Sequence, residues 1–471
     1  MTARQIPGVL TTCLLVVLLG CQANDPLRAQ AASQFVPWSQ VSMTAALPGK
    51  TDLTLYQGGW GLVTDSRPMS LKMGLQGIRF PSVPIQTQAE GAYLQLPAEV
   101  LRRRFRYDAS SINQLLAQYD GKSVEIVSRT GTASAIVLMT ATGPMYRIGD
   151  RLYVTPPGKL ALPITKGLAS VPSLDWMVKA SASWQGIATA SYICNQLDWH
   201  SSYTLITDPR QSQGRLQHWA DLSNQSGGNF RQVRVTLIAG NVRRLRAPMP
   251  VMGGFRAYAA PMAEAEPYAG RYAYHLPGRI DLPWGIKENL QLEEFNGITI
   301  DRHFQVGGSA GIYPLNTQEL PQHARLRLEI ENTTTDHLGK PLPAGTVTVY
   351  TPDKEGILAI AGEATIPDTP VKQKLILDLG EAFDVTSQRR QTIYQVKPDG
   401  HEVGYAITLK NEQAQPVTVE VLETIPGDWT MVSASQPYDR LTANQIRFRV
   451  PVPAKGEVVV SYEASIKKEP R

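Results

Sequence analysis

Short segments that alternate apolar and polar residues recur along most of this chain, and they constrain its fold more than any other feature. A period of two places every second side chain on one face, which is typical of a β-strand with one buried side. Such segments lie at 53–56, 77–80 and 92–96, and beyond residue 275 at 325–330, 346–350, 374–379, 404–409, 417–422, 445–450 and 457–462. The sequence therefore predicts a mainly β protein with several antiparallel sandwich or barrel domains, ending in an immunoglobulin-like sandwich.

Composition supports a folded chain with many turns. The 471 residues include 38 Gly and 34 Pro, which punctuate strands more often than they extend helices. The chain is 42% hydrophobic and 18% charged. This balance is sufficient to fill a core, so it excludes wholesale disorder.

One helix is predicted, at 110–119, because Ile112, Leu115 and Leu116 fall at helical spacing. Three residues could serve as its N-cap: Asp108, Ser110 and Ser111. Five short strands follow within about 50 residues, a pattern that resembles a small Sm-like or SH3-like barrel. We therefore expect a helix-plus-barrel module at 110–169.

The remaining organisation follows from composition shifts along the chain. Predicted segments are a lipoprotein signal peptide at 1–21, a flexible tether at 22–50, a β region at 51–109, the module at 110–169, a β-sandwich region at 170–300 and a C-terminal sandwich at 301–471. Met, Ala, Pro, Gly and Tyr dominate residues 247–274, which we interpret as a mobile insertion between strands.

The N-terminus carries a targeting signal. Its apolar run at 9–19 has the length of a signal-peptide core and is too short to span a bilayer. The run ends in LLGC at 18–21, which resembles a bacterial lipobox, in which Cys21 is lipidated, for example with palmitate, and becomes the first mature residue. Gln22 follows instead of aspartate, which by the sorting rule for such lipoproteins favours the outer membrane, facing the periplasm. The alternative is an ordinary secretory peptide with an incidental cysteine.

The three cysteines exclude a disulfide framework. Cys13 would leave with the signal and Cys21 would carry lipid, so Cys194 would remain alone in the mature chain. A single cysteine in a strand-like segment is predicted to be a small buried hydrophobe.

Several segments resemble bacterial envelope proteins that carry domain of unknown function 4139. They are NQSGGNF at 224–230, LIAGNV at 237–242, LPAGTVTVY at 342–350, GEAFDV at 380–385 and ETIPGDW at 423–429. The resemblance runs from about residue 53 to 466 and implies a β-rich protein with no established catalytic residues. In the last segment, Gly427 is expected in a turn and Trp429 over the sandwich core.

A serine hydrolase is the competing enzyme hypothesis. Residues 307–311 read GGSAG, which satisfies the G-x-S-x-G pattern with Ser309 as nucleophile. That chemistry needs a strand, a sharp elbow and then a helix, but Pro314 disfavours a helix there. A glycine-rich turn is the simpler interpretation.

Charge is distributed unevenly. Residues 22–279 carry 26 Lys and Arg against 15 Asp and Glu, whereas 280–471 carry 19 against 26. Arginines bind phosphate and carboxylate in bidentate fashion, so they are candidate contacts for an anionic lipid or glycan. The candidates are Arg243, Arg244, Arg246, Arg256 and Arg271. Solvated loop charge that aids solubility is the alternative explanation.

The seven histidines show no metal-ligand spacing, so no metal or other cofactor is predicted. We expect a lipid-anchored protein of the bacterial cell envelope that is not an enzyme and acts as a binding or scaffolding module. Its expected partners are the membrane, through the lipid, and an envelope protein or an anionic glycan or lipid. Nucleic acid is not expected for an exported chain. A purely structural role in assembly with other envelope proteins is the third hypothesis.

Overall fold

The computed structural model describes residues 36–129, 131–164, 168–243, 257–258, 264–311, 313–314 and 321–468. The chain divides into two compact units built from interleaved segments. The first comprises 1–48, 67–81 and 95–188, and the second comprises 49–66, 82–94 and 189–471. The sequence had suggested continuous segments instead.

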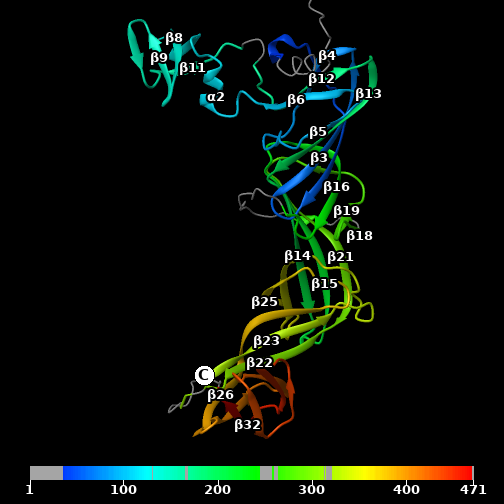
Figure 1. Ribbon diagram of the computed structural model, residues 1–471, viewed down its shortest axis with the longest axis vertical. Coiled ribbons are helices and arrows are strands. Elements are labelled where there is room, and N and C mark those ends of the chain that lie inside the picture. Colours follow the sequence, from blue (N-terminus) through cyan, green and yellow to red (C-terminus); the bar gives the residue numbers. More distant parts are fainter. Residues whose placement is uncertain are drawn as a thin grey trace, which may run out of the picture. The chain divides into compact units, whose positions relative to one another are not determined.

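The first unit holds two sheets and the one α-helix of the described residues (Figure 1). A four-stranded sheet has the order β1 (Met43–Ala45), β4 (Gly74–Pro81), β12 (Ser173–Ala180) and β6 (Glu99–Arg106). Before it lies the short 3₁₀-helix η1 (Trp38–Gln40). Strand β12 lies between β4 and β6, and its six consecutive residues from Ser173 to Val178 are buried, so side chains on both faces of the strand are shielded from water.

The predicted helix is confirmed as α2 (Ile112–Ala117), and Ser111 is its N-cap. The Ser111 hydroxyl accepts a hydrogen bond from the backbone N–H of Gln114 at 3.1 Å. This bond satisfies one of the donors that a helix start leaves free. Leu116 is the residue of α2 that is buried.

The five strands after α2 form an open sheet, so the predicted barrel closure is wrong. The order is β10 (Arg151–Tyr153), β9 (Gly143–Ile148), β8 (Gly131–Thr140), β7 (Ser123–Ser128) and β11 (Lys159–Ala161). Closure would require the two edge strands β10 and β11 to pair, and they do not pair in the described structure. Each has only three residues, which offers few hydrogen bonds to close a barrel.

The second unit contains three sheets. One follows the order β18 (Glu264–Tyr268), β19 (Arg271–His275), β16 (Phe230–Ala239), β2 (Lys50–Tyr56), β3 (Trp60–Leu71), β13 (Trp184–Asn195) and β5 (Tyr93–Gln95), and β20 (Ile280–Leu282) also pairs with β16. Strands β3, β5 and β13 have residues in both units. Because β18 and β19 are regular strands, this part of the predicted mobile insertion belongs to a sheet. Residues 244–256 and 259–263 lie outside the described residues.

The next sheet has six strands, in the order β17 (Ala257–Tyr258), β21 (Lys287–Thr299), β15 (Gln213–Asn224), β14 (Leu197–Thr207), β24 (Gly345–Pro352) and β25 (Leu358–Ile366). Strand β14 buries every second residue, as its alternating sequence predicts. The apolar core beside this six-stranded sheet includes Leu205, Phe295 and Val347 from the sheet itself. It also includes Leu328 and Leu377, which belong to the nine-stranded sheet described next.

The last sheet has nine strands and encloses an extensive apolar cluster of its own. The order is β29 (Trp429–Ala434), β32 (Gly456–Lys467), β27 (Gly400–Asn411), β26 (Lys374–Lys397), β23 (Gln322–Glu331), β22 (Asp301–Ser309), β28 (Val417–Thr424), β31 (Gln445–Val452) and β30 (Tyr438–Arg440). Val419 of β28 and Phe448 of β31 lie in the same apolar cluster as Val385 of β26, Tyr405 of β27 and Tyr462 of β32, which come from the other part of the strand order. The sheet therefore curves over its own core in a sandwich-like arrangement, which we call the C-terminal sandwich.

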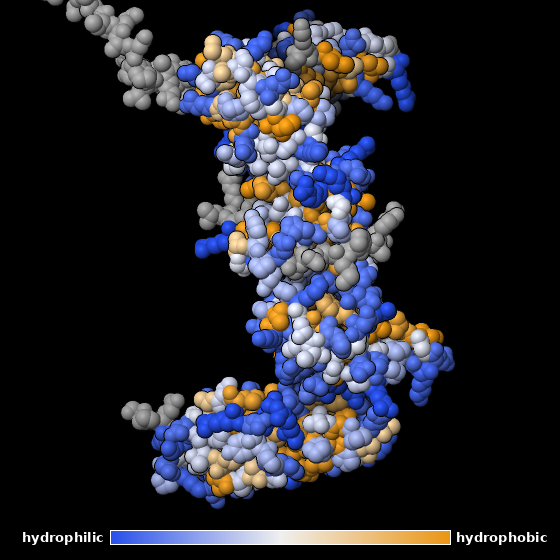
Figure 2. Space-filling view, turned by 90° about the vertical axis from the view of Figure 1, so that its right-hand side faces the viewer, coloured by the Kyte–Doolittle hydropathy of each residue, from blue (hydrophilic) through white to orange (hydrophobic). Residues whose placement is uncertain are grey.

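This sandwich confirms the mainly β prediction. Trp429 covers its core as expected: 5% of the residue is exposed, and its indole N–H donates to the carbonyl of Ala443 at 2.9 Å. Gly427 takes the left-handed conformation, with φ of 70°. On the face displayed in Figure 2, hydrophobic side chains form small separate patches among hydrophilic ones, as expected for strands that bury one side. No helix in the described residues is long and apolar enough to cross a membrane.

Candidate functional site

Of the five arginines predicted to contact an anion, the structure describes Arg243 and Arg271. Cys21, Arg244, Arg246 and Arg256 lie outside the described residues, whereas Arg243 is exposed. The Arg271 guanidinium donates to backbone carbonyls, at 3.0 and 3.2 Å to Asn241 and at 3.1 Å to Ala269. Arg271 therefore holds the turn before β19 to the segment after β16, and this use limits its donors for a ligand.

Ser309 is the last residue of strand β22, and the described residues that follow it at 310–311 and 313–314 form no helix. It is exposed on β22 and pairs in parallel register with Thr424 of β28. Within the described residues, no hydrogen bond joins the Ser309 hydroxyl to a histidine. The geometry that makes a G-x-S-x-G serine nucleophilic is a strained turn beside a base, and it does not occur here.

A buried ion pair lies beneath the glycine-rich end of β22. The guanidinium of Arg389 on β26 binds the carboxylate of Glu423 on β28 in bidentate fashion, at 3.1 Å from Nε and 2.8 Å from Nη2. Only 6% of Arg389 and 1% of Glu423 are exposed. The Tyr462 hydroxyl donates to the second carboxylate oxygen at 2.5 Å, and the Arg389 guanidinium lies 3.5 Å from the Tyr405 ring centroid.

The electrostatics of this pair favour the charged form of Arg389. Burial alone would lower the pKa of Arg389, but the charge and hydrogen bonds of Glu423 outweigh burial and raise it. Burial and the neighbouring Glu423 raise the pKa of Tyr462, so its phenol stays protonated and remains a donor. A buried pair of this kind is stable because both partners are satisfied, and removal of one partner leaves an uncompensated charge.

The glycines of the GGSAG segment fit this pair. A Cβ at Gly308 would lie 2.4 Å from Glu423 Oε1 and 2.5 Å from Arg389 Nε. At Gly307, which faces the opposite side of the sheet, a Cβ would meet nothing closer than the Leu422 carbonyl at 3.6 Å. The Gly311 N–H donates to the Tyr405 hydroxyl at 2.9 Å. The segment thus has a structural explanation that needs no nucleophile.

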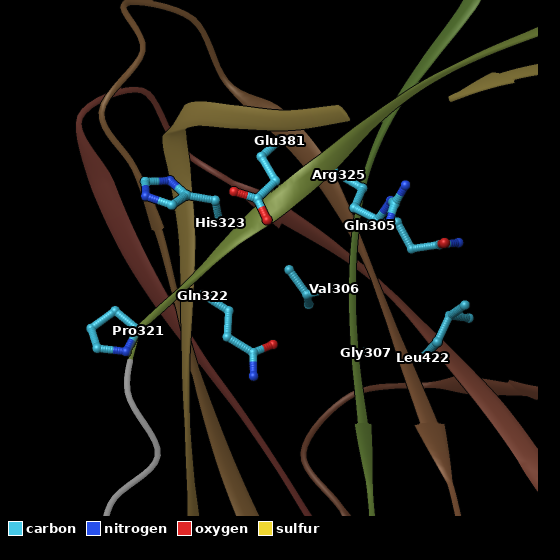
Figure 3. Close-up of a pocket in the computed structure, with 9 residues that line it drawn as sticks. All are labelled: Gln305, Val306, Gly307, Pro321, Gln322, His323, Arg325, Glu381 and Leu422. Carbon is cyan, nitrogen blue, oxygen red and sulfur yellow. The ribbon is translucent and has the colours of Figure 1, made fainter. Parts of the chain in front are cut away.

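A pocket of about 510 Å³ opens on the other side of β22 (Figure 3). Its volume lies in the ~300–1,000 Å³ range of small-molecule sites. Strands β22, β23, β26 and β28 supply most of its lining, which consists of Gln305, Val306, Gly307, Pro321, Gln322, His323, Arg325, Glu381 and Leu422. Cross-strand pairing places Gln305, Arg325 and Glu381 in one row over three neighbouring strands.

The pocket holds polar groups that are open to a ligand. The side chains of Gln322 and Glu381 form no hydrogen bond or ion pair with other described residues. Gln305 uses its Oε1 to accept from Arg327 at 3.0 Å, which leaves its NH₂ group available. By contrast, the Arg325 guanidinium is engaged with Asp378 at 3.0 Å. A few polar groups placed in a concave site are the usual means by which a pocket orients its ligand.

An exposed aromatic ring borders this pocket. Phe383 on β26 is 87% exposed and stacks on the His323 ring, with centroids 5.9 Å apart and an interplanar angle of 20°. His323 Nδ1 lies 3.2 Å from the carbonyl of Ala382. Sequence reasoning missed the pocket as a site, although Glu381 and Phe383 fall in one of the segments that carried the family resemblance.

A second polar network lies in the core of the six-stranded sheet. The Ser201 hydroxyl and His218 Nε2 are 3.0 Å apart, and His218 Nδ1 is 3.7 Å from Glu293 Oε2. Lys340 binds the other Glu293 oxygen at 2.7 Å. Ser201, His218 and Glu293 are 3%, 0% and 1% exposed, so no substrate can reach this serine in the folded protein. The Tyr203 ring stacks on the His218 ring, with centroids 4.7 Å apart, so the histidine is packed within the core.

This network predicts a pH dependence of stability. Burial lowers the pKa of His218 from its ordinary value of 6.5, so the unfolded chain binds a proton at a higher pH than the folded chain. The stability that neutral His218 contributes is therefore present above pH 6.5 and is lost as the pH falls toward the lowered pKa. Urea unfolding just below pH 6.5 should show this slope in the wild type and a weaker one in His218→Asn. Equal slopes in the two proteins would contradict the prediction.

The basic run at 102–106 forms β6 in the first unit, where buried Asp175 compensates part of its charge. Asp175 is 0% exposed and binds Arg79 Nε at 2.7 Å and Arg104 Nη2 at 3.2 Å. The Arg104 guanidinium also lies 4.2 Å from the Trp38 ring centroid. These arginines consequently stabilise the four-stranded sheet.

Cys194 is buried, as the sequence predicts, with 0% exposed. Burial raises the pKa of its thiol to about 12, although neighbouring hydroxyls lower it slightly. Since the thiolate is the reactive form, Cys194 should not react with a thiol reagent such as DTNB in the folded protein and should react fully in denaturant. Rapid labelling of the native protein would contradict this prediction.

A comparison with protein families finds a match that includes all five of the quoted motifs. A model of the family described as domain of unknown function (DUF4139) matches residues 188–467, which is more than half of the chain. The chain belongs to the DUF4139 family. The DUF4139 match begins at residue 188, so it does not cover 53–187, where we had expected the resemblance to start. It includes β22, β23, β26 and β28, and hence the pocket. A comparison with curated proteins finds no match.

The DUF4139 region also offers no obvious metal centre. No group of three or more His, Cys, Asp or Glu side chains is arranged to hold a metal ion in the described residues.

Proposed function

We propose that this protein is a non-catalytic binding module of the bacterial cell envelope, held at the outer membrane by lipid on Cys21 and facing the periplasm. The pocket over β22, β23, β26 and β28 is its binding site. The observation that carries this proposal is the set of open polar groups at Gln322, Glu381 and Gln305 beside exposed Phe383.

Rigidity supports a binding role. The strands that line the pocket are fixed from the inner side by the Arg389–Glu423 pair. A preformed pocket on a sheet spends little binding free energy on ordering its own side chains and backbone. Catalysis by Ser309 has less support, because the serine is the last residue of a paired strand and no hydrogen bond joins it to a histidine within the described residues. A fluorophosphonate probe that labels the wild type but not Ser309→Ala would revive the hydrolase hypothesis.

Photocrosslinking in cells tests the binding site. A photoreactive phenylalanine derivative at Gln322 should give a discrete crosslinked species. The same group at Gln395, an exposed glutamine of β26 outside the pocket, should not. The absence of a species specific to position 322 would overturn the proposed site.

The anchor has a separate test. Cys21→Ala should abolish labelling by radioactive palmitate and should release the protein from the membrane fraction. Membrane retention of the unlabelled variant would argue for ordinary secretion followed by another kind of attachment.

The arginines form a second proposed contact, for an anionic glycan or lipid. Arg243 is exposed, and the sequence places ten arginines, no lysine and three acidic residues within 210–279. Replacement of Arg243, Arg244 and Arg246 by serine should weaken envelope association of the delipidated protein, most clearly at low salt. Unchanged association would exclude this contact.

A further inference from the structure

We infer that the pocket of the C-terminal sandwich binds a neutral glycan that contains an N-acetylated amino sugar. The inference rests on the proposed function, because it names the ligand of the same pocket. It follows from the open hydrogen-bonding groups, the exposed aromatic ring and the charge of the pocket.

The open groups match the chemistry of such a sugar. An amide side chain offers a donor and an acceptor side by side, and the acetamido group of the sugar offers the complementary pair. Gln322 presents a complete amide, and Gln305 presents its NH₂ group, since its oxygen already accepts from Arg327. The Glu381 carboxylate accepts hydrogen bonds only, so it suits the hydroxyl groups of a sugar ring.

Phe383 supplies the apolar part of the site. A phenylalanine that is 87% exposed leaves a large apolar area in water, which is unfavourable at roughly 25 cal/mol per Å². Its partner His323 stacks against it at 5.9 Å and restrains the ring. One side of a pyranose ring carries mainly C–H groups. That side can cover the Phe383 ring while the hydroxyl groups of the sugar reach Glu381 and Gln305.

The charges disfavour an anionic ligand. Arg325, the arginine of the pocket lining, is bound to Asp378 at 3.0 Å. Glu381 remains as a carboxylate without a cationic partner among the described residues and would repel phosphate or carboxylate groups. A phosphorylated lipid headgroup is therefore a poor fit, and a neutral sugar is a good one.

Calorimetric titration of the delipidated full-length chain tests this assignment, with tetra-N-acetylchitotetraose as the probe. We expect saturable binding that is weakened about tenfold or more in Phe383→Ala, a loss equivalent to about 1.4 kcal/mol. Val396→Ala is the matched control, because Val396 is 72% exposed on the same strand but does not line the pocket. Cellotetraose lacks the acetamido groups and should bind at least about tenfold more weakly.

Three outcomes would overturn the assignment: no binding of the acetylated tetramer, equal binding by Phe383→Ala, or equal affinity for cellotetraose. A crosslinked species at position 322 without binding of the tetramer would refute the ligand class alone. The loss of both signals would refute the binding site as well.

Discussion

Replacing Arg389 by methionine is expected to lower the free energy of unfolding of the C-terminal sandwich by about 3–5 kcal/mol. The substitution leaves the Glu423 carboxylate, of which 1% is exposed, without its cationic partner. Urea unfolding monitored by tryptophan fluorescence, to which Trp429 of the same core contributes, would measure the loss.

The neighbouring residue provides the control. Arg390 is exposed on the same strand, and Arg390→Met should change the unfolding free energy by no more than about 0.5 kcal/mol. The double variant Arg389→Met with Glu423→Leu should recover much of the stability, because apolar replacement of a whole buried pair is often neutral. Equal stability of the two single variants would show that the ion pair does not stabilise the fold.

Gly308→Ala is expected to destabilise the sandwich by about 1–3 kcal/mol, the usual range for overpacking a core. The added methyl would lie 2.4 Å from Glu423 Oε1 and 2.5 Å from Arg389 Nε, so the buried pair must move. Gly307→Ala adds the same methyl on the pocket side, where the nearest atom is 3.6 Å away. It should leave stability unchanged or raise it slightly, because alanine restricts the unfolded chain.

The two adjacent glycines thus separate the effect of a close contact with the ion pair from the effect of adding a methyl group to the backbone. Thermal or urea unfolding of both variants measures the difference directly. If the variants are equally stable, the account of the GGSAG segment as a cover for the ion pair is wrong. A loss of stability only at Gly307 would contradict it in the same way.

Local patterns in the sequence were sufficient for the strands and the helix, because these depend on neighbouring residues. Alternation gave β24 and β28, and helical spacing with a serine cap gave α2. The same alternation contained a further signal. Val419 and Val421 point inward on β28, so Glu423 had to point inward too, and a buried carboxylate needs a partner.

The identity of that partner could not be predicted locally. Arg389 reaches Glu423 because β26 and β28 belong to one curved sheet, and β28 joins it by parallel pairing with β22. The pocket depends on the same distant pairings, since Gln305, Arg325 and Glu381 come from three strands. Barrel closure failed as a prediction for a related reason, because strand spacing does not determine whether two edges meet.

The most direct test of the central claim is the retention of delipidated protein by isolated envelopes when the pocket is altered. Gln322→Ala with Glu381→Ala removes two exposed polar groups of the pocket, and Gln395→Ala with Glu355→Ala is a matched change of exposed residues elsewhere. We expect the wild type and the control to be retained equally and the pocket variant to be retained much less, with the same unfolding free energy in all three. Equal retention of the pocket variant would contradict it.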